Sequence, residues 1–409
     1  MKEEKDILNR DVEIPEVVRK KADQAFAKIR AEQEETGMDN KKVVSYNKKN
    51  TGSTKATRKV TRIQGRIHHV QAAAVACAVL IGAGGITATA AVIHHLWSRG
   101  MQANIQATEE QQKNLTDQGM VTQFDQAYNS ANSDLTGMEV TSEGITVKPM
   151  EMIADGHFVH LSFQVEGYDL PDGEEPFFET VKVYTGDEET AEDSFVNMNG
   201  SFYNGIICDE NGNPVYEDGT PLTTDENGTT IERYKAEDGT LEYVMTLYKP
   251  DPEESLLGQM LHVQMENLGT VKKTMFMNGI EGTWSFDIPV SGKDAAQTYE
   301  LNAPLENVNV TVLSAALSPI SVRVDYEVTG EIQAQEDDNG LPEVGGVVLK
   351  DGSRLLYLLD GGQIGYQDDT HAYEISSFDR VIDVDQVQSL LFRIHAGDSP
   401  EKYESVDLR

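Results

Sequence analysis

The amino-acid sequence predicts a mainly β protein with two extracytoplasmic β-sandwich domains, one transmembrane helix and one short N-terminal amphipathic helix. Three observations lead to this prediction. An uncharged apolar run from Val70 to Ile93 is long enough to cross a bilayer. After residue 138, short runs alternate between apolar and polar residues, and Asp-Gly or Asn-Gly pairs separate them. Near the N-terminus, apolar residues recur at helical spacing.

Charge is distributed unevenly along the 409 residues. The whole chain has 34 Lys plus Arg and 69 Asp plus Glu, a formal charge of −35. Residues 1–70 carry 17 basic and 11 acidic side chains, whereas residues 101–409 carry 16 basic and 58 acidic ones. A strongly acidic surface repels phosphate, so we expect the long C-terminal part to bind neither nucleic acid nor anionic lipid.

The predicted transmembrane helix covers residues 70–96. The 22 uncharged residues from Ala72 to Ile93 would span about 33 Å as a helix, against a hydrocarbon core of about 30 Å. Nine Lys and Arg residues and no carboxylate lie between positions 41 and 70, whereas acidic residues dominate after the run. The positive-inside rule then predicts a single-pass cell-membrane protein with a cytoplasmic N-terminus and an extracytoplasmic C-terminus. Trp97 would lie at the outer interface.

Two alternatives to this span remain open. The run could be a buried core helix rich in Ala and Gly, although so long a segment with such unequal flanks is uncommon in a soluble core. It could also be the apolar part of a cleaved signal peptide, since Ala88-Thr89-Ala90 has the small-x-small pattern. About 70 residues precede the run, however, and a signal peptide normally begins with a short basic region.

Residues 1–69 form the predicted cytoplasmic region. Pro15 and Glu16 are typical of a helix start, and the predicted helix covers residues 14–36. We expect its narrow apolar stripe to bind a protein partner in a groove, because the basic linker at 41–68 offers nothing to pack against it. The alternative is a solvated helix or one that lies on the membrane surface. The stripe consists of Val18, Ala22, Phe26 and Ile29.

The C-terminal part is predicted as a connector and two β-domains. Residues 97–137 are rich in Gln, Asn and Thr, and we expect a polar connector without a core. The first β-sandwich is expected at 138–292, where Ala154-Asp155-Gly156 joins two alternating runs as a hairpin. A second, smaller sandwich is expected at 293–409, with one short helical turn at 384–389. Strands are expected at 144–153, 157–165, 180–184, 201–207, 242–248, 260–266, 283–290, 307–313, 321–328, 346–349, 355–359 and 390–395, and a loop at 331–343.

The sequence offers no catalytic, cofactor-binding or metal-binding residue, so we expect neither an enzyme nor a cofactor. His157 and His160 are three residues apart on a predicted strand, which places them on opposite faces. Cys77 and Cys208 fall on opposite sides of the predicted topology and cannot pair within one chain. A calcium-loop pattern that begins at Asp209 has Pro214 where the pattern needs Gly. The many carboxylates are interpreted as solvated faces.

The order of these segments resembles a family of single-pass membrane proteins of Gram-positive bacteria, known as a domain of unknown function and often described as anti-sigma factors. The likeness covers most of the chain. It is carried by Ile14–Val18 with Ala25, Phe26 and Ile29, by the basic run before the span, and by Glu143–Val147, Asp155-Gly156 and Gly282–Gly292. Residues 293–409, with Leu317–Pro319 and Leu349–Gly352, are similar to the immunoglobulin-like domain that often follows.

The resemblance implies a cytoplasmic segment that binds a sigma factor and an outer module that senses the state of the envelope. No His-x-x-x-Cys-x-x-Cys motif precedes the span, so sigma binding is assigned to no known site. Our first hypothesis is therefore a membrane signalling regulator, with the bilayer, a sigma factor and an unidentified outer ligand as partners. The second is a membrane-anchored surface binding or structural protein without a sigma partner.

Overall fold

The computed structural model describes residues 61–63, 97–124, 138–186, 194–208, 214–225, 228–272, 275–306, 308–332, 340–394 and 402–408. The chain divides into two compact units, Met1–Thr57 and Arg58–Arg409. The predicted helix at 14–36, with Val18, Ala22, Phe26 and Ile29, lies outside the described residues, as do the predicted span at 70–96 and the start of the calcium-like loop. None of the described helices is both long and apolar enough to cross a membrane.

The prediction of a mainly β protein is confirmed. Two helices and one 3-10 turn are described: α2 (Arg99–Asn104), α3 (Glu109–Gln118) and η5 (Val384–Gln386). The strands of what we call the first β part are β2 (Val121–Gln123), β3 (Val140–Ser142), β4 (Ile145–Ala154), β5 (Phe158–Glu166), β6 (Glu175–Thr185), β7 (Asn197–Phe202), β8 (Ile206–Cys208), β9 (Pro214–Tyr216), β10 (Leu241–Tyr248), β11 (Met260–Lys272) and β12 (Met275–Pro289). Those of the second β part are β1 (Thr61–Ile63), β13 (Gln297–Pro304), β14 (Val310–Leu317), β15 (Ser321–Val328), β16 (Glu343–Leu349), β17 (Arg354–Leu356), β18 (Leu359–Tyr366), β19 (His371–Phe378), β20 (Val387–Ile394) and β21 (Lys402–Asp407).

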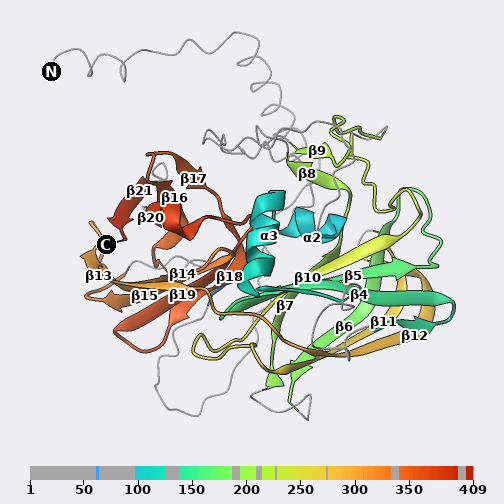
Figure 1. Ribbon diagram of the computed structural model, residues 1–409, viewed down its shortest axis with the longest axis horizontal. Coiled ribbons are helices and arrows are strands. Elements are labelled where there is room, and N and C mark those ends of the chain that lie inside the picture. The colour runs from blue at the N-terminus through green and yellow to red at the C-terminus, as the bar shows by residue number, and fades with distance from the viewer. Residues whose placement is uncertain are drawn as a thin grey trace, which may run out of the picture. The chain divides into compact units, whose positions relative to one another are not determined.

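Two sheets of the first β part enclose one core. One sheet has the order β2-β4-β5-β10-β7, with β3 beside β4, and the other has the order β12-β11-β6 (Figure 1). Ring contacts join the sheets, for example Phe163 to Phe286 at 5.3 Å between centroids. Trp284, which is fully buried, donates its indole N–H to the carbonyl of Ile145 at 3.0 Å. The predicted hairpin between β4 and β5 is confirmed by their antiparallel pairing.

The second β part also has two sheets and a core of its own. The sheet orders are β1-β18-β19-β15-β14-β13 and β17-β16-β20-β21. Tyr326 and Phe392 meet across this core, with ring centroids 6.2 Å apart. The two large cores therefore lie on either side of residue 293, one between Phe124 and Val290 and the other between Leu305 and Leu408. The division into domains at 138–292 and 293–409 stays a prediction, because residues 58–409 group as one compact unit.

The expected polar connector at 97–137 is wrong for residues 97–124, which are folded. Thr108 and Gln111 form a capping box at the start of α3, with Gln111 N donating to Thr108 Oγ1 at 3.2 Å. Met101 and Leu115 are buried in a small core. Trp97 belongs to the same core and is 3% exposed, so in this structure it packs against protein rather than at a lipid interface.

Several strands lie outside the expected ranges. The expected strand at 201–207 is broken, because β7 ends at Phe202 and β8 begins at Ile206. Strands β2, β3, β9, β13, β19 and β21, and most of β18, were not predicted from the sequence. The short helical turn expected at 384–389 is present as η5. Thr61–Ile63, expected within the cytoplasmic linker, pairs antiparallel with β18 as β1.

Candidate functional site

Residues 97–124 form a joint between the two β parts. The backbone N–H of Gln106 donates to the carbonyl of Asp379 at 2.8 Å, and the N–H of Val381 donates to the carbonyl of Gln106 at 2.8 Å. The apolar core of the joint combines residues from both β parts with residues from α2 and α3. Its buried members are Trp97, Met101, Ile105, Ala107, Leu115, Met120, Ile153, Ile320 and Val381. The segment thus contributes a shared core rather than a connector.

Asp155 ties the β4–β5 hairpin to the second β part. Its Oδ1 accepts hydrogen bonds from the backbone N–H of His157 at 2.9 Å and of Phe158 at 2.8 Å. Its Oδ2 accepts from the hydroxyls of Ser318 at 2.5 Å and Ser321 at 2.6 Å. From the sequence, Asp155 was expected only as a turn residue. Because Asp155, Ser318 and Ser321 are all buried, this carboxylate is a structural bond between the two β parts.

A second set of contacts joins the two β parts directly, at β18. The hydroxyl of Tyr248 donates to the carbonyl of Gly362 at 3.0 Å, and Gln363 Nε2 donates to the carbonyl of Pro250 at 2.6 Å. Phe158 and Tyr248 pack with Tyr373 and Ile375 in a four-residue apolar cluster. The two β parts are therefore bonded at two places, at Asp155 and at β18. Contacts at two places limit rotation of one β part against the other.

Two buried carboxylates hold the beginning of α2. Glu151 accepts from the backbone N–H of Ser98 at 2.8 Å, and Glu242 accepts from the backbone N–H of Gly100. Burial raises the pKa of Glu151 to about 7 and also raises the pKa of Glu242. The first residues that the structure describes after the apolar run are therefore held by titratable groups of the first β part.

A pocket of about 260 Å³ opens beside α2 and touches both β parts. Four carboxylates and three aromatic rings contribute to its lining, whereas no Lys or Arg does. These residues come from α2, the start of β6, the end of β7, residues 203–206 and 232–234, β10, β18 and the residue after β19. The lining consists of Gly100, Ala103, Asn104, Glu175, Ser201, Phe202, Tyr203, Asn204, Ile206, Glu232, Tyr234, Val244, Asp360 and Asp379.

The carboxylates of the pocket differ in their partners. Asp379 forms a bidentate ion pair with Arg380, at 2.7 and 2.8 Å. Glu232 accepts from the hydroxyl of Tyr234 at 2.6 Å and from Asn204 Nδ2 at 3.0 Å, which are both neutral donors. Among the described residues, Asp360 has neither a hydrogen-bond donor nor a cation partner. Burial, and to a smaller extent Asp379, raises the pKa of Asp360 to about 7.

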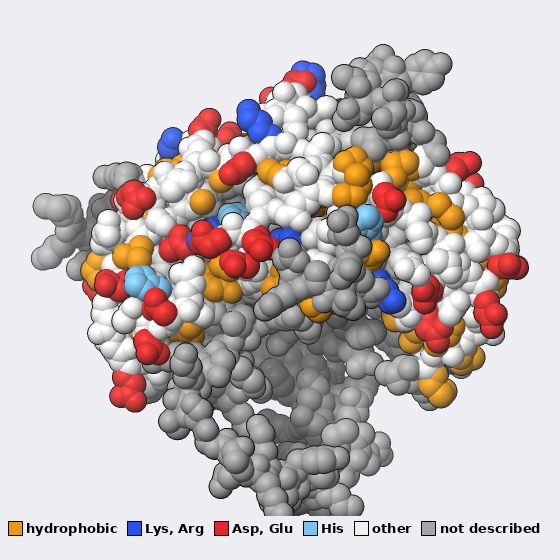
Figure 2. All heavy atoms as spheres, turned by 90° about the horizontal axis from the view of Figure 1, so that it is seen from below, with side chains coloured by type: hydrophobic (Ala, Val, Ile, Leu, Met, Phe, Trp, Pro, Cys, Tyr) orange, Lys and Arg blue, Asp and Glu red, His pale blue; other side chains and the backbone are white. Residues whose placement is uncertain are grey.

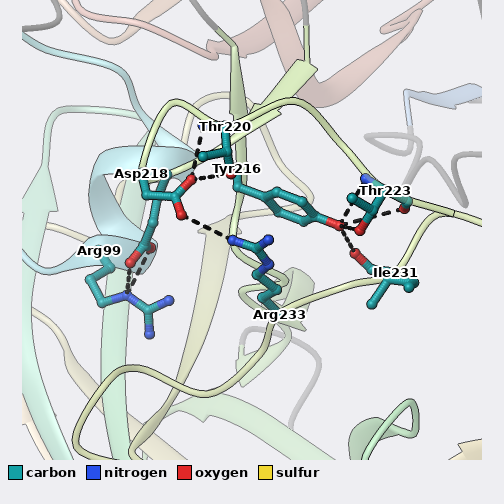
Figure 3. Close-up of polar contacts among 8 residues, drawn as sticks. Arg99, Tyr216, Asp218, Thr220, Thr223, Ile231 and Arg233 are labelled. Atoms are coloured by element: carbon teal, nitrogen blue, oxygen red, sulfur yellow. Dashed lines mark hydrogen bonds and ion pairs between the residues drawn. The ribbon is translucent and has the colours of Figure 1, made fainter. Parts of the chain in front are cut away.

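An arginine stack lies in the segment that carries the lining residues Glu232 and Tyr234 (Figure 3). The guanidinium of Arg233 lies over the Tyr216 ring at 3.4 Å from its centroid and pairs with Asp218 at 3.1 Å. The Tyr216 hydroxyl donates to the carbonyl of Ile231 at 2.7 Å, which closes the segment on itself. Cation–π stacking and a buried hydroxyl together give this segment a defined shape.

The same segment is attached to α2 by Arg99. Its Nε pairs with Glu217 at 2.9 Å, and its guanidinium lies 5.1 Å from the centroid of the Tyr203 ring. Burial, followed by Glu217, raises the pKa of Tyr203, so its hydroxyl stays protonated at neutral pH. Arg99 is thus paired with a carboxylate that is not part of the pocket lining.

His160, which was not expected to bind a metal ion, is a core residue. His160 is fully buried, and its Nδ1 lies 2.9 Å from Asn104 Nδ2 and 3.1 Å from Thr246 Oγ1. Burial lowers its pKa to about 4, so the ring is neutral at pH 7. In the described ranges, no group of three or more His, Cys, Asp or Glu side chains is arranged to hold a metal ion.

The pocket was not predicted from the sequence. Glu175 was interpreted as part of a solvated acidic face, and Asp360 as a turn residue before Gly361. Figure 2 shows why composition gives no signal, since Asp and Glu are spread over much of the face shown and few Lys or Arg accompany them. The local sequence offers one usable signal for the position of Asp360. Asp360 precedes the run Gly361-Gly-Gln-Ile-Gly365, which forms a buried strand rather than a turn.

Comparisons with known proteins do not identify the chain. No protein-family model matches it, and no curated protein matches it. A solved structure described as a conserved domain protein from Bacillus anthracis is 14% identical and aligns with a TM-score of 0.38, over 66% of this chain and 83% of that one. The CupB6 tip adhesin from Pseudomonas aeruginosa aligns with a TM-score of 0.13 at 10% identity, over 64% of this chain and 90% of that one.

Proposed function

We propose that the chain is a single-pass membrane signalling regulator of the anti-sigma type. In this proposal, residues 1–69 are cytoplasmic, residues 70–96 cross the cell membrane, and the two β parts, apart from β1, are extracytoplasmic. The stripe of Val18, Ala22, Phe26 and Ile29 binds a sigma factor, and the β parts sense an envelope signal. The charge difference across the apolar run and the resemblance of the segment order support this proposal.

One observation carries the proposed coupling between the outer part and the span. Where the described chain resumes after the apolar run, Trp97 is already in the core of the joint and Ser98 N is bonded to Glu151. A change in the position of one β part against the other would therefore act on the residues next to the span. A long free linker at this point would not transmit such a change.

The topology is tested by labelling single cysteines in intact cells. We replace Cys77 and Cys208 by Ser and introduce Cys in place of Ser45 or of exposed Glu327. A membrane-impermeant maleimide should label the Cys at position 327 and leave the Cys at position 45 unlabelled until the cells are opened. Labelling of both or of neither in intact cells would contradict the proposal.

The pairing of β1 with β18 makes this test sharper. If residues 72–93 cross a bilayer, Thr61–Ile63 and β18 lie on opposite sides of the membrane and cannot pair in the same chain. A disulfide between Cys residues introduced for Arg62 and its register partner Gln363 would therefore exclude the crossing. Its absence under oxidising conditions is the result expected from the proposed topology.

The partner is tested by affinity capture of the full-length chain from the cells that express it. Recovery of a sigma factor supports the proposal. Recovery of none contradicts it and favours the second hypothesis, a membrane-anchored surface protein without a sigma partner. Phe26→Asp should abolish the recovery because it places a charge in the apolar stripe. Gln24→Asp, on the opposite side of the predicted helix, introduces the same charge and should leave the recovery unchanged.

A further inference from the structure

We propose that the pocket beside α2 binds a small organic cation, an alkylammonium or guanidinium group, between the Asp360 carboxylate and the aromatic rings of its lining. This inference deepens the sensing role proposed above by naming the chemistry of an outer ligand. The site consists of side chains from both β parts, so an occupant would contact each of them.

The charge of the pocket favours a cation. Glu232 receives hydrogen bonds from neutral donors, and among the residues that the structure describes Asp360 receives none. Both Asp360 oxygens are therefore available to an N–H donor that enters the pocket. Asp360 is partly buried and lacks a donor, and a bound ammonium or guanidinium group would compensate its charge and supply the hydrogen bonds.

The lining favours an organic cation over a metal ion. No three acidic or His side chains converge in the way a metal ion requires, in the part of the chain that the structure describes. Phe202, Tyr203 and Tyr234 instead line the pocket, and the faces of aromatic rings attract alkylammonium and guanidinium groups. Asn104 and Ser201 add neutral polar atoms to the lining.

The size of the pocket limits its occupant. Pockets for drug-sized ligands are commonly about 300–1,000 Å³. At about 260 Å³, this one fits a short amine or a single Lys or Arg side chain. The stack of Arg233 on Tyr216, next in sequence to the lining residues Glu232 and Tyr234, is formed without a ligand, so binding would not have to order it.

The test measures binding of cadaverine and of Nα-acetyl-lysine-N-methylamide to the purified full-length chain by calorimetry, with 1-pentanol as an uncharged probe. We expect at least one cation to bind with 1:1 stoichiometry and 1-pentanol not to bind. The cation that binds more tightly identifies whether the source is a free amine or a peptide side chain. Absence of binding by both cations, or equal binding of 1-pentanol, would overturn the proposal.

Two variants with the same loss of charge locate the site. Asp360→Asn should weaken binding at least tenfold, whereas Glu327→Gln, on the exposed face of β15, should leave it unchanged. Equal affinity of wild type and Asp360→Asn would overturn the proposal, as would equal weakening by both variants, which indicates diffuse attraction to the acidic surface. No sigma factor enters this measurement, so its failure and the failure of the proposed function are separate results.

Discussion

Asp155 and Ser318 are 163 residues apart in the chain, and the Ser318 hydroxyl donates to Asp155 Oδ2 at 2.5 Å. Ser321 donates to the same oxygen at 2.6 Å. The hairpin turn of the first β part is thereby bonded to the turn that precedes β15 in the second. All three side chains are 1% exposed, so water does not compete for these bonds.

We expect Asp155→Ala to destabilise the protein by about 3 kcal/mol, because it removes a buried acceptor of four hydrogen bonds and leaves two buried hydroxyls without this partner. Urea unfolding of the purified chain measures the loss. Asp172→Ala, at a side chain exposed to solvent, should change the free energy of unfolding by less than about 0.5 kcal/mol. Similar values for both variants would show that Asp155 does not join the β parts.

Leu115 tests whether residues 97–124 are a folded joint or the polar connector expected from composition. Its side chain is 2% exposed in the core shared by both β parts. Leu115→Ala should cost about 3 kcal/mol in the free energy of unfolding, because it leaves a cavity among packed side chains. Lys113→Ala, on the exposed side of α3, should cost less than about 0.5 kcal/mol. A small effect at both positions would support the connector.

The strand prediction succeeded where one face of a strand is buried. Ser321–Val328 was predicted with the bounds that the structure gives to β15, since its apolar residues alternate with polar ones. It failed at β18, where the pair Asp360-Gly361 suggested a turn. Gly362 has a φ of +146°, and a Cβ there would lie 2.0 Å from the carbonyl oxygen of Ile375, so the glycine permits close strand contact rather than a turn.

Composition also misled the prediction for residues 97–124, because a Gln-rich segment can be buried when its amides are bonded. Gln112 is fully buried, and its Nε2 donates to Gln102 Oε1 at 2.6 Å. The pocket could not be predicted from the sequence for a related reason. Asp360 and Glu232 are two of many acidic residues, and only the tertiary arrangement shows that they share a pocket without a Lys or Arg in its lining.

The stack of Arg233 on Tyr216 should contribute to stability through the ring rather than through the exposed ion pair. Arg233→Lys keeps the charge but loses the planar contact, so we expect a loss of about 1 kcal/mol in the free energy of unfolding. Lys235→Ala removes a more distant pair, at 3.9 Å from Asp172, and should have no measurable effect. If Arg233→Lys and wild type have the same urea midpoint of unfolding, the stack of Arg233 on Tyr216 does not stabilise the protein.

The last prediction concerns pH and the carboxylate that holds Ser98. Burial raises the pKa of Glu151 from 4.5 to about 7 in the folded chain, so the folded state keeps its proton where the unfolded state has lost it. The stabilisation from this proton is fully present below pH 4.5 and is lost as pH rises through 7. Wild type should therefore lose up to about 3 kcal/mol from this group between pH 4.5 and pH 8, at 1.36 kcal/mol for each pKa unit.

Glu151→Gln removes that dependence while its amide oxygen can still accept the hydrogen bond from Ser98 N. The pKa values of Asp360 and Glu374 are also raised to about 7 by burial, and burial lowers that of His160 to about 4, but both proteins contain these groups. The difference in urea unfolding between variant and wild type therefore reports Glu151 together with its electrostatic interaction with Glu242. The variant should gain stability relative to wild type as pH rises from 5 to 8, whereas Glu109→Gln, on the exposed side of α3, should follow wild type at every pH. A constant difference between Glu151→Gln and wild type over this range would mean that Glu151 is ionised in the folded chain at pH 5.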